Sequence, residues 1–258
     1  MADDNFACSC LSNGFQLKYV LMKNIFSRTK EKKEKKKREG SIFREYFELI
    51  TETLIFVFFI MTFLLQSFVI PTGSMEDSLL IGDHLLVDKV AYAGRANPID
   101  RLVLPTMQIE RGMVVTFKSP PEMEKEYVKR VIGLGGETIQ IIDKRVYING
   151  EPLDEPYVVF KDPEVNNNLR DNMPPYRIPE HHYFCLGDNR DNSYDSRFWG
   201  AVPDSYLIGK PWRIYWSYES TTEDYMTPGV LHKLKDISRT LLNFVSKTRW
   251  ERTVKKIK

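Results

Sequence analysis

The stretch EYVKRVIGLGGETIQIID, Glu126 to Asp143, holds the pattern that decides the fold. Two short segments rich in β-branched and aromatic residues stand on either side of the glycine-rich sequence GLGG. Such residues favour a pleated strand, and glycine favours a tight turn. The stretch therefore predicts two strands joined by a turn.

The same pattern recurs from Asp83 to Glu219, in HLLVDKVAY, RGMVVTFK, RVYING, HHYFCLGD and PWRIYWSYE. Clusters of Gly, Pro and Asn separate these segments, and no segment of about 10 to 15 residues between them has helical spacing. This alternation indicates a mainly β, largely antiparallel domain over residues 71–228. Within it, Asp162–Pro175 is polar and rich in turn residues, and we expect it to form a long surface loop.

The run TLIFVFFIMTFLLQSFVI, Thr53 to Ile70, has no formal charge. As a helix it covers about 27 Å of a hydrocarbon core that is about 30 Å thick, so we expect a transmembrane helix over residues 48–70. A cleaved secretory signal is the alternative. The run is longer than the usual ~7 to 15 apolar residues of such a signal, and SFVIPT offers bulky side chains where a cleavage site needs small ones. A buried helix of a soluble core is also possible, although Phe and Leu lie on all sides of the run.

Basic residues flank only one end of this run. The segment KEKKEKKKRE, Lys30 to Glu39, precedes it, whereas Pro71–Asp88 contains no Lys or Arg. The positive-inside rule then keeps the N-terminus in the cytoplasm and places the β domain on the other side. Residues 1–47 are expected to form a basic, partly disordered cytoplasmic segment.

The last thirty residues change in character. Residues 229–258 hold 9 Lys or Arg against 2 Asp or Glu. Apolar residues recur there at spacings of three and four, at Leu234, Ile237, Leu241, Phe244 and Val245. This pattern predicts a basic amphipathic helix that packs on its own domain or lies on anionic lipid.

Ser74 lies four residues past Ile70, in the turn PTGSM. Pro71 and Gly73 bracket a tight turn that holds the serine hydroxyl and backbone N–H in a fixed orientation. Four residues of chain reach at most about 14 Å, so any chemistry at Ser74 would take place at the membrane surface. A serine nucleophile needs a base, and histidine is the usual one. The spacing of the four histidines does not specify a triad or a metal site; they are His84, His181, His182 and His232.

Lys129 is the other candidate base. Period-two alternation places it between Tyr127 and Val131 on one face of a strand, with Arg130 on the opposite face. A solvated lysine has a pKa near 10.4 and is almost never neutral at pH 7. Burial would lower that pKa by up to several units and make Lys129 a usable base.

The segment GDNRDNSYDSRFWG, Gly187 to Gly200, is polar and ends in an aromatic pair. It does not fit a calcium loop, because the sixth position from Asp191 is Ser196 and the twelfth is Val202. Its Asp and Arg side chains can pair internally and leave a hydroxyl such as that of Ser193 free to orient a neutral amine. Cys8, Cys10 and Cys185 do not form a disulfide framework, and with no His or further Cys nearby the pair Cys8 and Cys10 is expected to be two free thiols and not a metal site.

Together these residues resemble the bacterial type I signal peptidases, which are membrane-anchored Ser/Lys proteases. The resemblance extends from the apolar run to about Glu219, with the motifs in the family's order: PTGSM, GDHLLVDK, YVKRVIGLGGE and GDNRDNSYDSRFWG. The last motif is the most specific of the four.

The resemblance implies that Ser74 is the nucleophile and Lys129 the general base. The Thr72 hydroxyl would join the Ser74 backbone N–H in the oxyanion hole. The family often has Ser at the position of Thr72, so the hydroxyl here is on a side chain with restricted χ1.

The resemblance also implies supporting and substrate-binding residues. Ser193 would hold the Lys129 amine, and Asp195 and Arg197 would form a supporting ion pair. Shallow pockets for small substrate side chains would be lined by Ile70, Met75, Leu79, Leu85, Tyr127 and Val128. The sequence departs from the family at Asp77, Ser78 and Gly135, which puts its fine substrate preference in doubt.

The implied activity is removal of N-terminal signal peptides from exported preproteins, after small residues and through an acyl-enzyme. The reaction implied by the resemblance needs no metal or cofactor. A processing peptidase dedicated to one substrate and an inactive membrane-tethered binding module are the alternatives. The expected partners are preprotein signal peptides and the lipid bilayer, and nucleic acid is not expected to bind. A single-pass location in the inner (plasma) membrane is expected, since the acidic start MADDNF does not resemble a transit peptide for a thylakoid. The oligomeric state is open.

Overall fold

The computed structural model describes residues 42–93, 107–226, 236 and 238–257. The chain divides into two units, Met1–Phe58 and Phe59–Lys258. The described part of the first unit is the α-helix α2 (Ile42–Phe59) apart from its last residue, and the side chains of residues 44–58 are mostly exposed. Arg44–Leu64 is the candidate membrane span by length and composition.

The second unit contains two β-sheets. The order in the seven-stranded sheet is β1 (Leu65–Val69), β2 (Asp83–Asp88), β11 (Leu207–Ser217), β3 (Val114–Lys118), β4 (Glu126–Gly133), β9 (His182–Leu186) and β10 (Val202–Pro203). The order in the four-stranded sheet is β7 (Glu151–Pro152), β6 (Arg145–Ile148), β5 (Thr138–Ile142) and β8 (Met173–Arg177). Every ladder between these strands is antiparallel, which confirms the mainly β fold predicted from the sequence.

Short helical turns lie between the strands and after the last strand, β11. The α-helical turns are α3 (Val90–Ala93), α5 (Ser196–Trp199), α6 (Thr222–Met226) and α8 (Phe244–Lys247). The 3-10 turns are η2 (Gly73–Met75), η3 (Arg190–Asn192), η4 (Asp204–Tyr206) and η5 (Trp250–Arg252). Two of these, η2 and η3, carry the segments PTGSM and GDNRDN that the sequence singled out.

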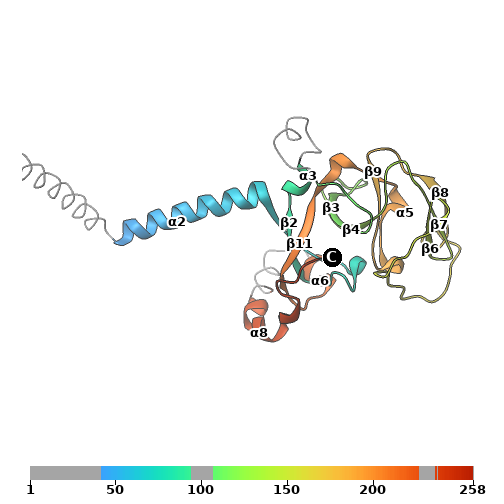
Figure 1. Ribbon diagram of the computed structural model, residues 1–258. Coiled ribbons are helices and arrows are strands. Elements are labelled where there is room, and N and C mark those ends of the chain that lie inside the picture. The colour runs from blue at the N-terminus through green and yellow to red at the C-terminus, as the bar shows by residue number, and fades with distance from the viewer. Residues whose placement is uncertain (1–41, 94–106, 227–235, 237, 258) are drawn as a thin grey trace, which may run out of the picture. The chain divides into compact units, whose positions relative to one another are not determined.

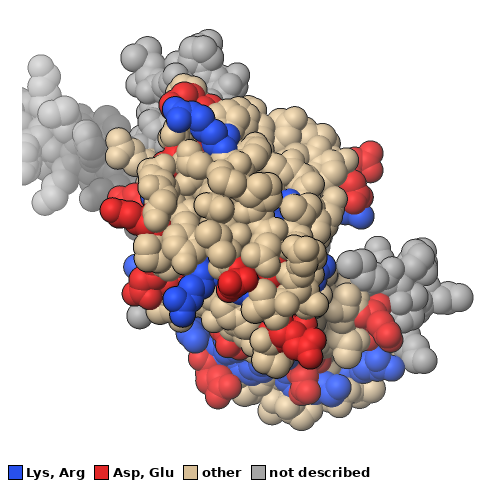
Figure 2. All heavy atoms as spheres, turned by 90° about the vertical axis from the view of Figure 1, so that its right-hand side faces the viewer, with Lys and Arg blue, Asp and Glu red and all other residues tan. Residues whose placement is uncertain are grey.

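The strands β6, β7 and β8 lie at one end of the domain, away from β2 and β11 (Figure 1). The face at that end carries Lys, Arg, Asp and Glu side chains intermixed over its lower part, and its upper part is mainly uncharged (Figure 2). Beneath the surface, the described residues form three clusters of buried apolar side chains, which make up the core. One of them includes Ile70, Met75, Leu79 and Leu85, so it supports the turn that carries Ser74.

The apolar run ends differently from the prediction. The helix α2 continues into a π-helical turn, η1 (Ile60–Leu64), and the chain then becomes strand β1. Strand β1 pairs with β2, with Phe68 opposite Leu85 and Val69 opposite His84, and Ile70 is buried in the core. Residues 65–70 therefore belong to the β domain. The expected helical boundary at Ile70 is wrong because strand pairing and core packing satisfy the backbone and side chains of this segment.

The predicted helix over residues 229–258 is not confirmed. Residues 227–235, 237 and 258 lie outside the described residues; residues 238–242 are helical, and α8 covers Phe244–Lys247. After Lys247 the chain forms isolated bridges to β11 and its flank, between Tyr218 and Thr248 and between Arg213 and Lys256. Residues 248–257 therefore contribute backbone pairing to the β domain in place of a continuous helix.

Candidate active site

Ser74 is the middle residue of the 3-10 turn η2, and the backbone of Thr72, which precedes the turn, is extended. The Glu76 N–H donates to the Gly73 carbonyl at 3.2 Å, and the Leu79 N–H donates to the Met75 carbonyl at 2.7 Å. Met75 is 1% exposed and packs into the core, whereas Ser74 is only partly buried. The turn is thus anchored from below, and its serine hydroxyl remains accessible.

Asn189, from the GDNRDN segment, holds this turn from a second direction. Its backbone N–H donates to the Ser74 carbonyl at 3.2 Å, and its side-chain amide donates to the Gly73 carbonyl at 3.1 Å. The two segments are so close at Gly187 that an added Cβ would lie 2.5 Å from the Ser74 carbonyl oxygen. Only glycine fits at this crossing.

Lys129 extends from β4 toward the same turn. Its Nζ lies 2.5 Å from Ser74 Oγ, and the lysine is 3% exposed. The pKa of Lys129 is lowered to about 8, mainly by burial and also by the neighbouring Arg197 charge, against the opposing effects of Asp195 and Asp188. An amine with that pKa is neutral in a substantial fraction of molecules near physiological pH.

Arg130 lies on the opposite face of β4, as the alternation predicted. Its guanidinium donates to both oxygens of Asp188, at 2.8 Å and 2.7 Å, and both side chains are buried. Ser78, which follows the Ser74 turn, also donates to Asp188 at 2.6 Å. The strand that carries Lys129 is therefore tied to both the GDN segment and the Ser74 turn.

Asp195 and Arg197 form a fully buried bidentate ion pair, with distances of 2.9 Å and 2.8 Å. Burial by itself would raise the pKa of Asp195, but the Arg197 charge and hydrogen bonds outweigh it and hold that pKa below its usual value. The Ser193 hydroxyl also contributes to this lowering. Even so, Ser193 Oγ is buried and has no hydrogen bond of ordinary geometry to the described residues, so the expected bond to the Lys129 amine is not formed here.

A cavity of about 590 Å³ opens at this site. Its lining includes Ser74, Lys129, Thr72 and Ser193, together with four of the residues expected to bind substrate, Ile70, Met75, Tyr127 and Val128. The other two, Leu79 and Leu85, are fully buried in the core cluster and do not line the cavity. None of the described histidines lines it either.

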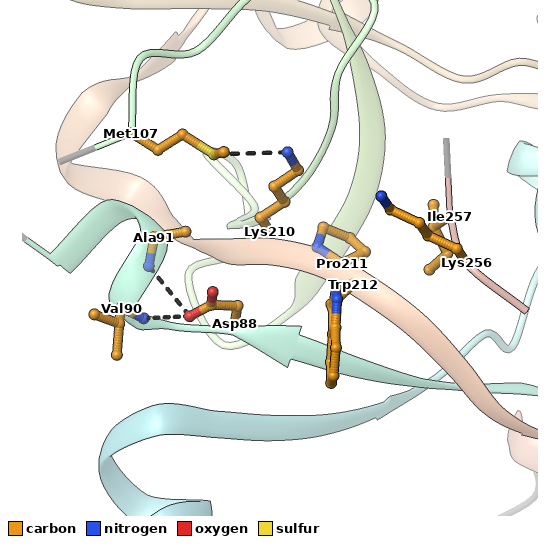
Figure 3. A pocket seen from close by; sticks show the side chains of 9 residues that line it. All are labelled: Asp88, Val90, Ala91, Met107, Lys210, Pro211, Trp212, Lys256 and Ile257. Atoms are coloured by element: carbon orange, nitrogen blue, oxygen red, sulfur yellow. Dashed lines mark hydrogen bonds between the residues drawn. The ribbon is translucent and has the colours of Figure 1, made fainter. Parts of the chain in front are cut away.

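A second cavity, of about 460 Å³, lies beside β11 and contains no comparable pair of groups. Figure 3 shows that the Asp88 carboxylate accepts the backbone N–H groups of Val90 and Ala91, and that the Lys210 amine points to the sulfur of Met107. These side chains are occupied with local structure. The Ser74 cavity is therefore the better candidate for chemistry.

Sequence reasoning missed Asn189 and the Arg130–Asp188 pair. Both Asp188 and Asn189 stood in the motif GDNRDNSYDSRFWG, but nothing in a linear motif tells which member meets a turn more than 110 residues away. The signal that could have found Arg130 was its place next to a proposed buried base, because a buried guanidinium needs a carboxylate.

The family model and the curated relatives point to one family. Residues 43–216 match the family model described as signal peptidase, peptidase S26. The signal peptidase I of Pseudomonas aeruginosa is 35% identical over an alignment of 225 residues that covers 73% of this chain and 79% of that protein. A probable signal peptidase I-2 of Synechocystis is 32% identical over 201 residues, 76% of this chain and 83% of that protein. A crystal structure of a signal peptidase I from Enterococcus faecalis V583 has 34% identity, covers 40% of this chain and 96% of that chain, and has a TM-score of 0.34.

The fold and the matches together define an enzyme of the peptidase class. More narrowly, the chain belongs to the signal peptidase family, peptidase S26, as its sequence motifs had indicated.

Proposed function

We propose that this protein is a membrane-bound endopeptidase that removes N-terminal signal peptides from exported preproteins. Its membership of the signal peptidase family supports the reaction and the substrate class. The observation that carries the mechanism is the distance of 2.5 Å between Lys129 Nζ and Ser74 Oγ. A hydroxyl beside a buried amine whose pKa is lowered to about 8 is what a Ser/Lys dyad requires.

In this mechanism the neutral Lys129 amine takes the proton of Ser74 as its oxygen attacks the scissile carbonyl. The resulting ammonium gives that proton to the departing amine, so the peptide bond breaks and an acyl-enzyme remains. A water molecule then attacks the ester, with Lys129 again accepting a proton and returning it to Ser74. The burial of Lys129 supports this cycle, because a solvated ammonium could not accept the first proton.

The oxyanion of the tetrahedral intermediate is held by the Thr72 hydroxyl and the Ser74 backbone N–H. Thr72 lines the same cavity as Ser74 and precedes it by two residues, which supports this assignment. The role assigned to Ser193 is to hold the Lys129 amine by a hydrogen bond. Its hydroxyl lines the same cavity as Lys129 and forms no hydrogen bond of ordinary geometry to the described residues, so it remains available to the amine.

The signal peptide binds as an extended strand beside β1, with small residues before the scissile bond. Among the described residues β1 pairs only with β2, so its other edge can accept backbone hydrogen bonds from a peptide. Ile70 and Val128 line the cavity next to Ser74 and would limit the side chains that fit. We assign Leu79 and Leu85 the role of supporting this wall from the core.

The helix over Arg44–Leu64 is proposed to anchor the enzyme in the inner (plasma) membrane. Its 21 residues correspond to about 31 Å, which is enough to cross a hydrocarbon core of about 30 Å. The basic N-terminal flank supports an N-terminus in the cytoplasm and an extracytoplasmic catalytic domain. Enzyme and preprotein would then share one membrane, which raises their encounter frequency.

The test is cleavage of a preprotein by the purified full-length protein in detergent. Ser74→Ala and Lys129→Ala should each abolish cleavage, whereas Lys118→Ala, at an exposed lysine on β3, should leave it unchanged. An active Lys129→Ala variant would refute the base assignment. No cleavage by the wild-type protein of any of several unrelated preproteins would refute the general peptidase.

A further inference from the structure

Arg170 is held in a fixed position at the edge of the Ser74 cavity. It lies in the loop between β7 and β8, and its backbone carbonyl accepts a hydrogen bond from the buried Arg197 at 3.0 Å. Its own guanidinium donates to the Asp191 carbonyl oxygen and lies 5.4 Å from the centroid of the Phe198 ring. Two contacts thus orient the cation, and a third fixes the backbone that carries it.

The charge of Arg170 has no acidic partner among the described residues. By contrast, Arg130, Arg190 and Arg197 each bind a carboxylate within 2.8 Å. The neighbouring Asp191 carboxylate is already occupied, because it accepts the Lys144 amine at 2.9 Å and two backbone N–H groups at 2.7 Å and 2.8 Å. A guanidinium fixed in this way keeps donors available for an external anion.

Arg170 shares its cavity with the proposed dyad. The cavity lining includes Arg170, Asn192 and Tyr194 as well as Ser74 and Lys129. Tyr194 is 49% exposed and stacks on Phe198, with ring centroids 5.4 Å apart. Arg170 and Tyr194 therefore form one cationic and aromatic rim, which we call the Arg170 rim, on the same cavity as the reacting groups.

We propose that the Arg170 rim binds an acidic side chain, Asp or Glu, of the substrate segment that follows the scissile bond. This inference rests on the proposed function. The wall formed by Phe68, Ile70 and Val128 is apolar and suits the signal peptide that acylates Ser74. The polar Arg170 rim is then left for the leaving segment, which becomes the N-terminus of the released protein. Guanidinium and carboxylate groups match in bidentate geometry, and the aromatic ring limits the freedom of the bound chain.

The test uses the full-length enzyme in detergent and a set of peptide substrates with one constant signal sequence. Each substrate carries Glu, Gln or Lys at one of the first four positions after the scissile bond. At one or more of these positions the wild-type enzyme should cleave the Glu substrate about 3 to 10 times faster than the Gln substrate in kcat/KM, and the Lys substrate more slowly still. The preference should weaken from about 0.05 M to about 0.5 M salt.

Variants assign this preference to the rim. Arg170→Gln should bring the Glu-to-Gln ratio close to one, Arg170→Glu should favour Lys over Glu, and Arg170→Lys should retain part of the preference for Glu. The matched control is Arg145→Gln, at an exposed arginine on β6 that does not line the cavity, and its ratio should equal that of the wild type.

Three results would overturn the proposal. They are equal rates for Glu and Gln at all four positions, a ratio that persists in Arg170→Gln, and an equal slowing of all substrates by Arg170→Gln with an unchanged ratio. The last result would make Arg170 a structural residue. Failure of the wild-type enzyme to cleave any substrate is a different outcome, because it contradicts the proposed peptidase and not the rim alone.

Discussion

Replacing Lys129 by methionine should stabilise the folded protein while it abolishes cleavage. Methionine is apolar and similar in length, so it can occupy the same buried site without an amine. Burial lowers the pKa of Lys129 from 10.5 to about 8. At about 1.4 kcal/mol per pH unit, this difference makes the protonated form of the folded protein about 3 kcal/mol less stable than it would be with a solvated lysine. The variant should recover much of that free energy of unfolding at pH 7.

The expected gain depends on pH in a defined direction. Between pH 8 and pH 10.5 the unfolded chain still binds the lysine proton and the folded protein has lost it. The stability of the wild-type protein should therefore rise with pH through this window, because the unfolded state binds more protons. The Met variant lacks this group, so its advantage of about 3 kcal/mol at pH 7 should shrink toward zero by about pH 10.5.

The measurement is urea unfolding of the full-length protein in detergent, followed by tryptophan fluorescence at pH 7 and pH 10. The control is Ser74→Ala, which also abolishes cleavage but keeps the buried amine, so its stability should show the wild-type pH dependence. A Lys129→Met variant that is less stable than the wild type at pH 7, or an advantage that is equal at both pH values, would show that Lys129 is not held in a desolvated state.

Four further predictions follow from the site and the core. The pH profile of kcat/KM should rise with a midpoint near pH 8, where Lys129 loses its proton; a midpoint near 10.5 would mean an ordinary lysine. Asp195→Asn leaves the buried Arg197 without its carboxylate and should lower the free energy of unfolding by about 3–5 kcal/mol, measured by urea. Asn189→Ala removes a hydrogen bond from the Ser74 turn and should lower kcat by about tenfold or more with little change in KM, measured with a peptide substrate. Leu85→Ala should lower the free energy of unfolding by about 2–5 kcal/mol and leave KM unchanged, because Leu85 lies in the core. A rise in KM without a loss of stability would instead support the contact with substrate that the sequence analysis expected.

Strand patterns in the sequence predicted much of the β domain, because strands such as β3, β4 and β5 are short, apolar on at least one face and bounded by turn residues. They missed β8, which begins at Met173, inside the segment Asp162–Pro175 that was expected to be a loop. Glu126–Gly133 illustrates this: its alternation correctly separated Lys129 from Arg130, and the glycine-rich turn leads into β5. The order of the strands was not predicted. It depends on long-range pairings such as β2 with β11, and local patterns carry no information on these partners.

The apolar run shows where composition fails. Leu65–Val69 continues the hydrophobic run without a charge, so a rule based on length and hydropathy assigns it to the membrane. The structure uses it as an edge strand beside β2 and buries Ile70 in the core. The same apolar side chains suit either environment, and only the partner strand, which the local sequence does not specify, decides between them.

The residues of the candidate site also fall into those that the sequence identified and those that only the structure reveals. Ser74 and Lys129 were singled out by motif and by chemistry, and the structure brings their side chains together across 55 residues of sequence. The hydrogen bond from Asn189 to the Ser74 turn depends on which backbone segment passes next to that turn. The burial of Leu85 depends on which side chains pack against it in the core. Both are features of the tertiary structure, and a sequence motif does not specify which distant segments come into contact.

The buried ion pairs around Lys129 are best explained by the charge state that the amine needs. Burial favours the neutral amine, whereas an unpaired carboxylate nearby would stabilise the ammonium form. Asp195 and Asp188 both raise the pKa of Lys129 in this way. Each of these carboxylates is compensated by its own arginine, Asp195 by Arg197 and Asp188 by Arg130. Buried pairs add little net stability in general, so stability is a weak reason for two of them beside one lysine. Neutralising the surroundings of the amine is a stronger reason, because it lets desolvation determine the proton affinity of the proposed base.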